Sequence, residues 1–272
     1  MRQFRPISVL ATLTLAVAMS GAGYAQTNAV PASSFVAPDA SPDFSTARAA
    51  AHLSPDSALA TYERGMQEQS SELAGYTATS VIDAELPDSS QKAEFELKQH
   101  YAAPSVLEFT PVRSTGDKFV KSNVIVRLLQ SEVDHVHKRE QSQTAISSEN
   151  YKFNYKGTSQ LDGAAVHVYD VKPRQKRVGL FKGKIYVDAS SGHLLRAQGT
   201  IVKSPSFFIK KIDFVQDYAT IDGFTFPTRM HSESQTRLVG KAVVDITHRD
   251  YQPELAGGGD SPLSATLVDG SN

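Results

Sequence analysis

The clearest pattern in the chain is a long series of β-strand signals between residues 150 and 251. Apolar and polar side chains alternate there, as around Tyr151 and Phe153, and a period of two places successive side chains on opposite faces of a sheet. Dipeptides such as Asp162-Gly163 are typical of the tight turn between antiparallel strands. The pattern predicts strands near residues 151–155, 165–171, 178–188, 194–202, 207–218, 224–230 and 237–251.

A shorter β pattern precedes this series. Residues 76–84 and 93–101 alternate in the same way, and the cluster 87–90 between them is rich in turn-forming residues. In the second segment the apolar residues face one way and the Glu and Lys residues face the other. We therefore expect a hairpin with one solvated face, followed by a short third strand at 106–109.

Before this hairpin, apolar residues recur at helical spacing. Ser54 is a favourable N-cap, and Pro55 suits the first helical position, where its missing N–H has no partner to lose. The pattern predicts a helix that ends near Leu73 and packs on the sheet, and the alternative is a movable lid over an apolar cavity. The stripe that carries the prediction consists of Leu59, Tyr62, Met66 and Leu73.

Residues 119–138 carry a second periodic pattern, which is ambiguous. Ser122 or Asn123 could cap a helix here. The β-branched run 124–126 lowers helix propensity, so the pattern favours a helix and leaves a strand open. The helical stripe consists of Val120, Val124, Leu128, Val133 and Val136.

The strands of the second half are long, because their turns are widely spaced. Long antiparallel strands twist strongly and curl toward a barrel. The Phe residues on one face also exceed what a flat sheet covered by one helix needs. The sequence therefore predicts an α+β, mainly β fold, in which a strongly curved antiparallel sheet forms an unclosed half-barrel and helices cover its open side.

The two ends of the chain differ from this domain in composition. Arg2 and Arg5, an apolar run at 7–19 and small residues before Ala25 are typical of a secretory signal peptide. We expect cleavage after Ala25 and a periplasmic or secreted location. The predicted organisation is a signal peptide at 1–25, a disordered linker at 26–50, a single domain at 51–252 and a disordered tail at 253–272.

Composition argues against several classes of function. The chain has 28 Lys and Arg against 29 Asp and Glu, which argues against a nucleic-acid partner bound through net positive charge. It has no Cys, so it contains no disulfide, thiolate metal site or Cys nucleophile. The sequence also lacks the motifs of serine hydrolases, zinc proteases and phosphate-binding loops. We predict a protein that is not an enzyme and needs no cofactor.

Glu132, His135 and His137 form a cluster of potential metal ligands. On a helix, Glu132 and His135 share a face and His137 lies elsewhere, whereas on a strand the two His residues share a face. Neither arrangement gives three convergent ligands, so we interpret the cluster as a solvated polar face and expect no metal site. His167 is interpreted as an ordinary strand residue rather than a catalytic base.

Several short motifs mark turns and strand registers in this series of strands. They are Tyr151-x-Phe153 with a later Gly163, Val168-Tyr169-Asp170-Val171-x-Pro173, Gly183-x-Ile185-Tyr186-Val187-Asp188-x-x-x-Gly192-x-Leu194-x-Arg196 and Gly223-x-x-x-Pro227. Together they resemble the LolA-like outer-membrane lipoprotein-sorting proteins of the bacterial periplasm over residues 150–251. The resemblance implies an unclosed antiparallel barrel plugged by helices, which carries acyl chains or senses lipidated or misfolded outer-membrane proteins. The cargo-contacting Arg of that family has no counterpart in residues 76–84, so no functional residue is transferred.

The leading functional hypothesis is an extracytoplasmic binding protein that carries an apolar ligand in outer-membrane or envelope biogenesis. The ligand would be a lipid acyl chain or a lipoprotein, held because each buried CH₂ contributes about 0.8 kcal/mol. The candidate lining residues equally fit a plain packed core, and they are Phe181, Ile185, Phe208, Ile212, Phe214, Phe224 and Phe226.

The alternative is a cell-envelope sensor or accessory interaction module with a filled core and no ligand. Its partner, an envelope membrane protein or anionic lipid surface, would dock on a basic patch. The same charges are also explained as solvated residues that discourage edge pairing. The candidate patch consists of Lys172, Arg174, Lys176, Arg177, Lys182 and Lys184.

Overall fold

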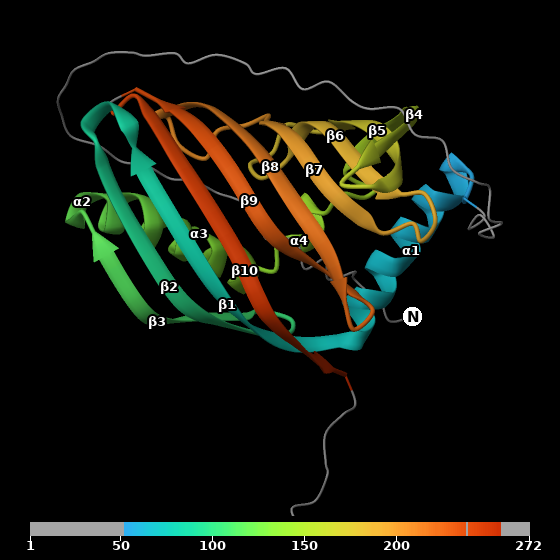
Figure 1. Cartoon of the computed structure of the whole chain (residues 1–272), viewed down its shortest axis with the longest axis horizontal. Helices are drawn as coiled ribbons and strands as arrows, with labels where there is room; N and C mark the ends of the chain where they lie inside the picture. The colour runs from blue at the N-terminus through green and yellow to red at the C-terminus, as the bar shows by residue number, and fades with distance from the viewer. Residues whose placement is uncertain (1–51, 238, 257–272) are drawn as a thin grey trace, which may run out of the picture.

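Ten strands form one antiparallel sheet in the computed structural model of the chain, which describes residues 52–237 and 239–256. Their order is β3-β2-β1-β10-β9-β8-β7-β6-β5-β4, and the sheet curves with its edges β3 and β4 unpaired to one another (Figure 1). This confirms the predicted mainly β, unclosed half-barrel. The strands are β1 (Leu73–Leu86), β2 (Gln91–Ala102), β3 (Val106–Gly116), β4 (Tyr151–Leu161), β5 (Ala164–Pro173), β6 (Phe181–Asp188), β7 (Leu194–Ile201), β8 (Ile209–Ile221), β9 (Phe224–Thr236) and β10 (Lys241–Leu255).

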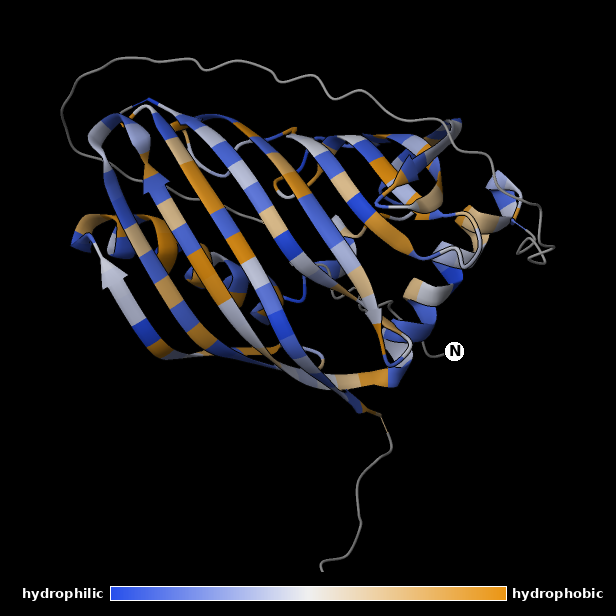
Figure 2. Cartoon of the chain, in the orientation of Figure 1, coloured by the Kyte–Doolittle hydropathy of each residue, from blue (hydrophilic) through white to orange (hydrophobic). Residues whose placement is uncertain are grey.

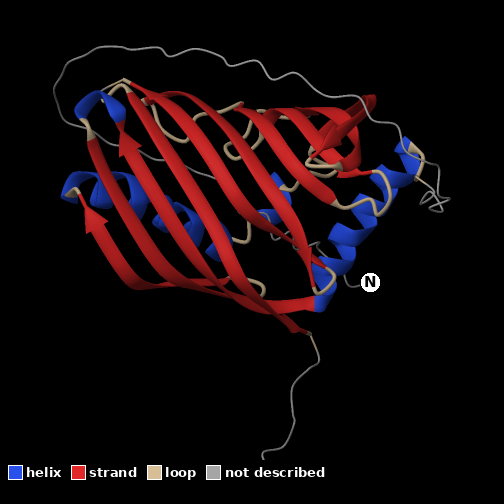
Figure 3. Ribbon diagram, viewed as in Figure 1, coloured by secondary structure: helices blue, strands red, loops and turns tan. Residues whose placement is uncertain are grey.

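Strands that are neighbours in the sheet are also consecutive in sequence, except where β1 pairs with β10. There Ser80 lies opposite His248, and Ile82 lies opposite Ile246. Because β3 and β4 are consecutive in sequence but form opposite edges, the segment between them crosses the open side of the sheet (Figure 3). This segment carries the helices α2 (Lys118–Val120), η2 (Lys121–Ile125), α3 (Val126–His137) and α4 (Gln141–Thr144), whereas η1 (Pro87–Ser89) lies in the turn between β1 and β2.

Apolar and polar residues alternate along the strands, as the stripes in Figure 2 show. In β1, Ile82 and Ala84 are buried on the concave face, whereas Asp83 between them is exposed. This is the alternation expected of a sheet with one face on a core and one in solvent. The predicted hairpin of β1 and β2 and the third strand β3 are confirmed.

Three apolar clusters fill the concave side. One packs Val120, Val124 and Leu128 of the crossing segment on strands β1, β2, β9 and β10. A second packs Ala58 and Tyr62 of α1 (Pro55–Glu72) on strands β4 to β7. The third is rich in aromatic rings, which include Tyr76, Tyr101, Phe226 and Tyr251.

The predicted helix after Ser54 is confirmed as α1. The Ser54 hydroxyl accepts a hydrogen bond from the backbone N–H of Ser57 at 3.2 Å, and Pro55 is the first helical residue. The helix ends at Glu72 and runs directly into β1. Its Tyr62 hydroxyl donates to the carbonyl of Ile146 at 2.9 Å, which ties α1 to the segment that crosses the open side.

The helix predicted at 119–138 is also confirmed, and the strand alternative is wrong. The cap is Asp117, whose carboxylate accepts from the backbone N–H of Val120 at 3.0 Å, and not Ser122 or Asn123. The β-branched Val124 and Ile125 fall in η2, a π-helical turn, and both are buried against the sheet. Packing of these side chains therefore outweighs their low helix propensity.

The structure differs from the predicted strands at several ends, and two of these differences have a clear cause. Phe207 and Phe208 lie in a turn before β8, because the backbone carbonyls of both residues accept hydrogen bonds from Arg237. The Arg237 guanidinium also lies 4.5 Å from the centre of the Phe207 ring. At the other end, β10 continues to Leu255, beyond the predicted tail boundary at 253, because Leu255 still pairs with Leu73. The predicted signal peptide and linker lie outside the described residues.

Candidate functional site

A cavity of about 60 Å³ lies between α3 and the concave face of the sheet. Leu128 and Leu129 line it from the helix, and Ile82 and Ile246 line it from β1 and β10. The other apolar lining residues are Leu107, Phe109, Val136 and Met230. The walls therefore come from two layers that are far apart in sequence and are brought together by the crossing segment.

A chain of hydrogen bonds runs across the sheet side of this cavity. Gln99 donates from Nε2 to the Tyr76 hydroxyl at 2.7 Å, and its Oε1 accepts from the Ser80 hydroxyl at 3.0 Å. Ser80 has one proton to donate, so its oxygen accepts from Nδ1 of His248, which lies 2.8 Å away. In this arrangement Nδ1 of His248 carries a proton.

Burial keeps this network uncharged. It lowers the pKa of His248 to about 4, so the imidazole is neutral at physiological pH. It also raises the pKa of Tyr76, which is raised further by the neighbouring Tyr101 and by the carboxylate of Glu132. The sheet side of the cavity therefore presents neutral polar groups within an apolar wall.

Tyr101 lies beside this network, but its hydroxyl is not hydrogen-bonded to it. Its side chain lines the cavity and is 2% exposed, yet within the part of the chain that the structure describes its hydroxyl has no hydrogen-bond partner. Burial raises its pKa to about 12. A buried hydroxyl without a partner costs free energy, because it has lost its hydrogen bonds to water.

The helix side contributes Glu132 and His135, which both line the cavity. Nε2 of His135 lies 3.1 Å from the Thr144 hydroxyl, and burial lowers the pKa of this imidazole against the opposing effect of Glu140. The predicted solvated face is therefore wrong for His135, which is buried, whereas His137 is exposed. The signal was present in the sequence, since Glu132 and His135 fall on the same helical stripe as Leu128.

Two other hollows flank α1. The larger, of about 170 Å³, lies between α1 and the segment 142–149 and has mainly polar lining residues such as Glu63 and Gln67. The smaller, of about 50 Å³, lies between α1 and the turns at Gly192 and Gly223. The cavity beneath α3 has the more apolar wall, which makes it the stronger candidate for an apolar ligand.

The structure places the seven predicted lining residues elsewhere. Six belong to the packed clusters described above or, in the case of Phe214, pack against one, and Phe208 is 38% exposed in the turn before β8. The six are Phe181, Ile185, Ile212, Phe214, Phe224 and Phe226. None of the seven lines the cavity beneath α3, so a ligand contact for any of them stays a prediction.

Some residues of the predicted basic patch form hydrogen bonds or ion pairs within the protein, and others do not. Nε of Arg174 donates to the carbonyls of Ser148 and Tyr151, at 2.8 and 3.2 Å, and Arg177 donates to the carbonyl of Gln143 at 3.3 Å. These two arginines hold the segment before β4 in place. Lys184 forms an ion pair with Asp170, and the exposed members of the patch are Lys172, Arg174, Lys176 and Lys182.

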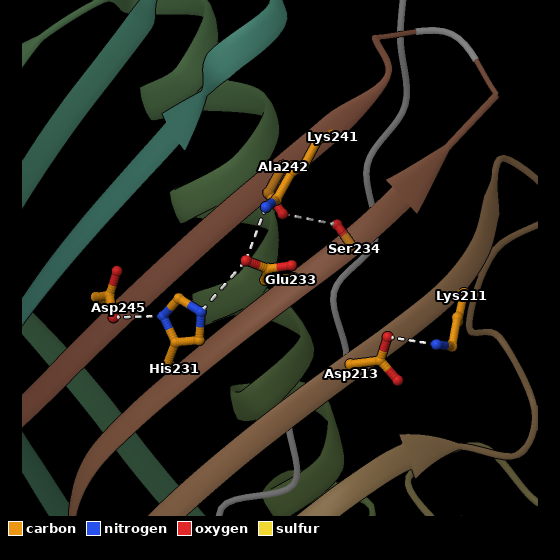
Figure 4. Close-up of polar contacts among 8 residues, drawn as sticks. All are labelled: Lys211, Asp213, His231, Glu233, Ser234, Lys241, Ala242 and Asp245. Atoms are coloured by element: carbon orange, nitrogen blue, oxygen red, sulfur yellow. Dashed lines mark hydrogen bonds and ion pairs between the residues drawn. The ribbon is translucent and has the colours of Figure 1, made fainter. Parts of the chain in front are cut away.

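The convex face carries cross-strand ion pairs (Figure 4). Nδ1 of His231 lies 2.8 Å from the Asp245 carboxylate, and Nζ of Lys241 lies 2.7 Å from that of Glu233. Such exposed pairs contribute at most about 1 kcal/mol each. Among residues 52–237 and 239–256, no group of three or more His, Asp or Glu side chains could hold a metal ion.

Within the same residues, none of the helices is both long enough and apolar enough to span a membrane.

One family model matches part of the chain. A family of unknown function, DUF5686, matches residues 143–250, which is less than half of the chain. No curated protein matches the sequence.

Matches among solved structures are of low identity and low TM-score. A DUF1329 family protein from Desulfovibrio piger is 12% identical, with a TM-score of 0.39 over 73% of this chain and 92% of its own. A putative outer membrane lipoprotein-sorting protein domain from Vibrio parahaemolyticus is 13% identical, with a TM-score of 0.39 over 76% and 92%. A LolA superfamily protein from Nitrosomonas europaea is 12% identical, with a TM-score of 0.35 over 74% and 94%.

Proposed function

We propose that the protein binds an apolar ligand, the acyl chain of a lipid or lipoprotein, in the cavity between α3 and the sheet. The observation that supports this function best is the composition of the cavity wall, in which apolar side chains from both layers surround a small set of buried polar groups. Ligand sites commonly have this composition. The predicted signal peptide supports an extracytoplasmic setting, in which such a protein would act in envelope biogenesis.

The cavity is too small for a whole chain in the conformation described. Its volume of about 60 Å³ compares with about 300–1,000 Å³ for ordinary ligand pockets. An acyl chain would therefore enter only when α3 moves away from the sheet. Each CH₂ that then becomes buried contributes about 0.8 kcal/mol, which offsets the loss of helix packing.

The two ends of α3 support such a movement. At its N-terminal end, the π-helical turn η2 interrupts the regular α-helical hydrogen bonding. At its C-terminal end, Arg139 has a φ of 57°, a left-handed conformation that stops the helix. The segment Val126–His137 is thus bounded by breaks on both sides, as a movable cover would be.

The alternative, an envelope interaction module with a filled core, is favoured by a different observation. Phe181, Ile185 and Phe226 are buried in packed clusters, which is the arrangement expected if the interior holds no ligand. A docking surface would then use the exposed Lys172, Lys176 and Lys182. Reversal of these three charges to Glu should abolish capture of a membrane partner and leave acyl binding unchanged.

Displacement of an uncharged fluorescent acyl ester from the purified protein tests the leading proposal, together with mass spectrometry of co-purified lipid. Leu129→Trp should fill the cavity and abolish binding, because Leu129 is a lining residue. Val126→Trp is the matched control, because Val126 is 47% exposed and lies outside the lining of the cavity. If the wild-type protein binds no probe and yields no lipid, or if both variants bind equally, the proposal is wrong.

A further inference from the structure

The unpaired hydroxyl of Tyr101 indicates what the polar part of a ligand would be. Its neighbours in the network, Ser80, Gln99 and Tyr76, satisfy one another through hydrogen bonds of 2.7 to 3.0 Å. Tyr101 on β2 lies opposite Tyr76 on β1. The two rings are stacked, with 5.3 Å between their centroids. The Tyr101 hydroxyl therefore remains as a buried hydrogen-bond donor at the edge of the cavity, where a ligand atom could accept a hydrogen bond from it.

The charges around the cavity restrict which atom this can be. Among the described residues, its lining includes the acidic Glu132 and no Lys or Arg. His135 and His248 do not supply positive charge near neutral pH, because burial lowers the pKa of each imidazole. A carboxylate or phosphate would thus be buried with no cationic side chain in the lining to compensate its charge, and burial of such an unpaired ligand charge is strongly unfavourable.

We propose that the cavity recognises an uncharged carbonyl group at the head of an acyl chain, in an amide or an ester, through donation from the Tyr101 hydroxyl, and that it rejects the free fatty acid anion. This inference rests on the proposed function and adds the chemical class of the ligand. An amide is the linkage of an N-acylated protein and an ester is that of a glycerolipid, so the two arms of the test separate these sources.

The experiment compares four ligands of equal chain length on the full protein at pH 8, where the acid is ionised. They are N-methyldodecanamide, methyl dodecanoate, dodecanoic acid and dodecylamine, each used to displace the fluorescent acyl ester. The amide and ester should bind, and the acid should bind at least about tenfold more weakly because its charge is not compensated. Tighter binding of the amide than of the ester would favour an acylated protein, and the reverse would favour a glycerolipid.

Two variants test the residues. Tyr101→Phe removes only the hydroxyl and should weaken the amide about 2- to 10-fold, while the affinity for dodecane stays unchanged. Glu132→Gln should bring the affinity of the acid closer to that of the ester. The thermal midpoint of Tyr101→Phe should equal or exceed that of the wild type, because the hydroxyl it removes has no partner to lose.

The outcomes separate the two proposals. If the uncharged ligands bind but the acid or the amine binds as tightly as the amide, or if Tyr101→Phe has no effect on the amide, the inference is overturned and the proposed function stands. A marked loss of stability in Tyr101→Phe would also overturn it, because the hydroxyl would then have a partner within the protein. If no ligand of any kind binds, the proposed function fails and the inference fails with it.

Discussion

The hydroxyl of Ser80 and Nδ1 of His248 lie 2.8 Å apart across the pairing of β1 with β10, and this contact joins residues from the two ends of the domain. Because the Ser80 hydroxyl donates a hydrogen bond to Gln99, its oxygen acts as the acceptor toward His248, and Nδ1 of His248 carries the proton of that contact. The Nδ1–H donor is present in both the neutral and the protonated ring, so it is burial that favours the neutral form. Protonation would place a charge in the buried wall of the cavity.

The stability of the protein should fall when His248 has to be protonated. Its pKa is about 4 in the folded protein and about 6.5 when unfolded, so the unfolded state binds the proton first as the pH falls. The stabilisation is fully present above pH 6.5 and is lost between about pH 6.5 and 4, by up to about 3 kcal/mol. Urea unfolding of wild type and His248→Asn across this range measures the effect.

His100 supplies the control, because it is exposed on the solvated face of β2. His100→Asn should retain the wild-type dependence on pH, whereas His248→Asn should flatten it. An equal dependence in both variants would show that another group, such as His135, is responsible.

Arg174 should stabilise the domain although it belongs to the predicted docking patch. Arg174→Ala removes the donor to the carbonyls of Ser148 and Tyr151 and should cost about 1–2 kcal/mol of unfolding free energy, because hydrogen bonds from charged donors exceed neutral ones. Lys176→Ala is the control: its side chain is also exposed, but among the described residues it makes no hydrogen bond or ion pair, so its loss should change stability by less than about 0.5 kcal/mol. Similar urea midpoints for the two variants would contradict this assignment.

Most of the fold is predictable from the sequence because alternation and turn signals are local. The stripe in β2 and the N-cap at Ser54 each depend on residues a few positions apart, and the structure confirms both. The turn at Phe208 was missed because its cause, hydrogen bonding to Arg237, is distant in sequence. Local patterns do not contain such contacts.

The residues that line the cavity could not be predicted for the same reason. Its polar residues Ser80, Gln99 and His248 come from three strands whose order depends on the pairing of β1 with β10. One sequence feature did indicate a buried polar contact here: Ser80 interrupts an otherwise apolar face of β1 that includes Ile82. A polar residue on a buried stripe requires a partner, and only the strand order identifies that partner.

Gly183 should be required where β6 passes β7. It lies opposite Gly199, and a Cβ at position 183 would clash with the backbone carbonyl of Gln198. Gly183→Ala should therefore cost about 1–3 kcal/mol of unfolding free energy through overpacking. Gly65→Ala is the matched control, since a Cβ on this glycine of α1 meets no atom within 4 Å, and it should stabilise by about 0.5–1 kcal/mol. Urea unfolding that gives the same sign for both would contradict this account.

The movement proposed for α3 should be visible in amide hydrogen exchange. If Val126–His137 separates from the sheet as a unit, its amides should exchange faster than those of the central strands β1 and β10, which open only when the domain unfolds. Saturation with N-methyldodecanamide should slow exchange in α3, because the ligand is held between the helix and the sheet, and should leave α1 unchanged as the internal control. Exchange in α3 that is as slow as in β10, with or without ligand, would instead indicate a permanently packed helix. The cavity of about 60 Å³ would then be a packing defect, and the filled-core alternative would be the better account of the molecule.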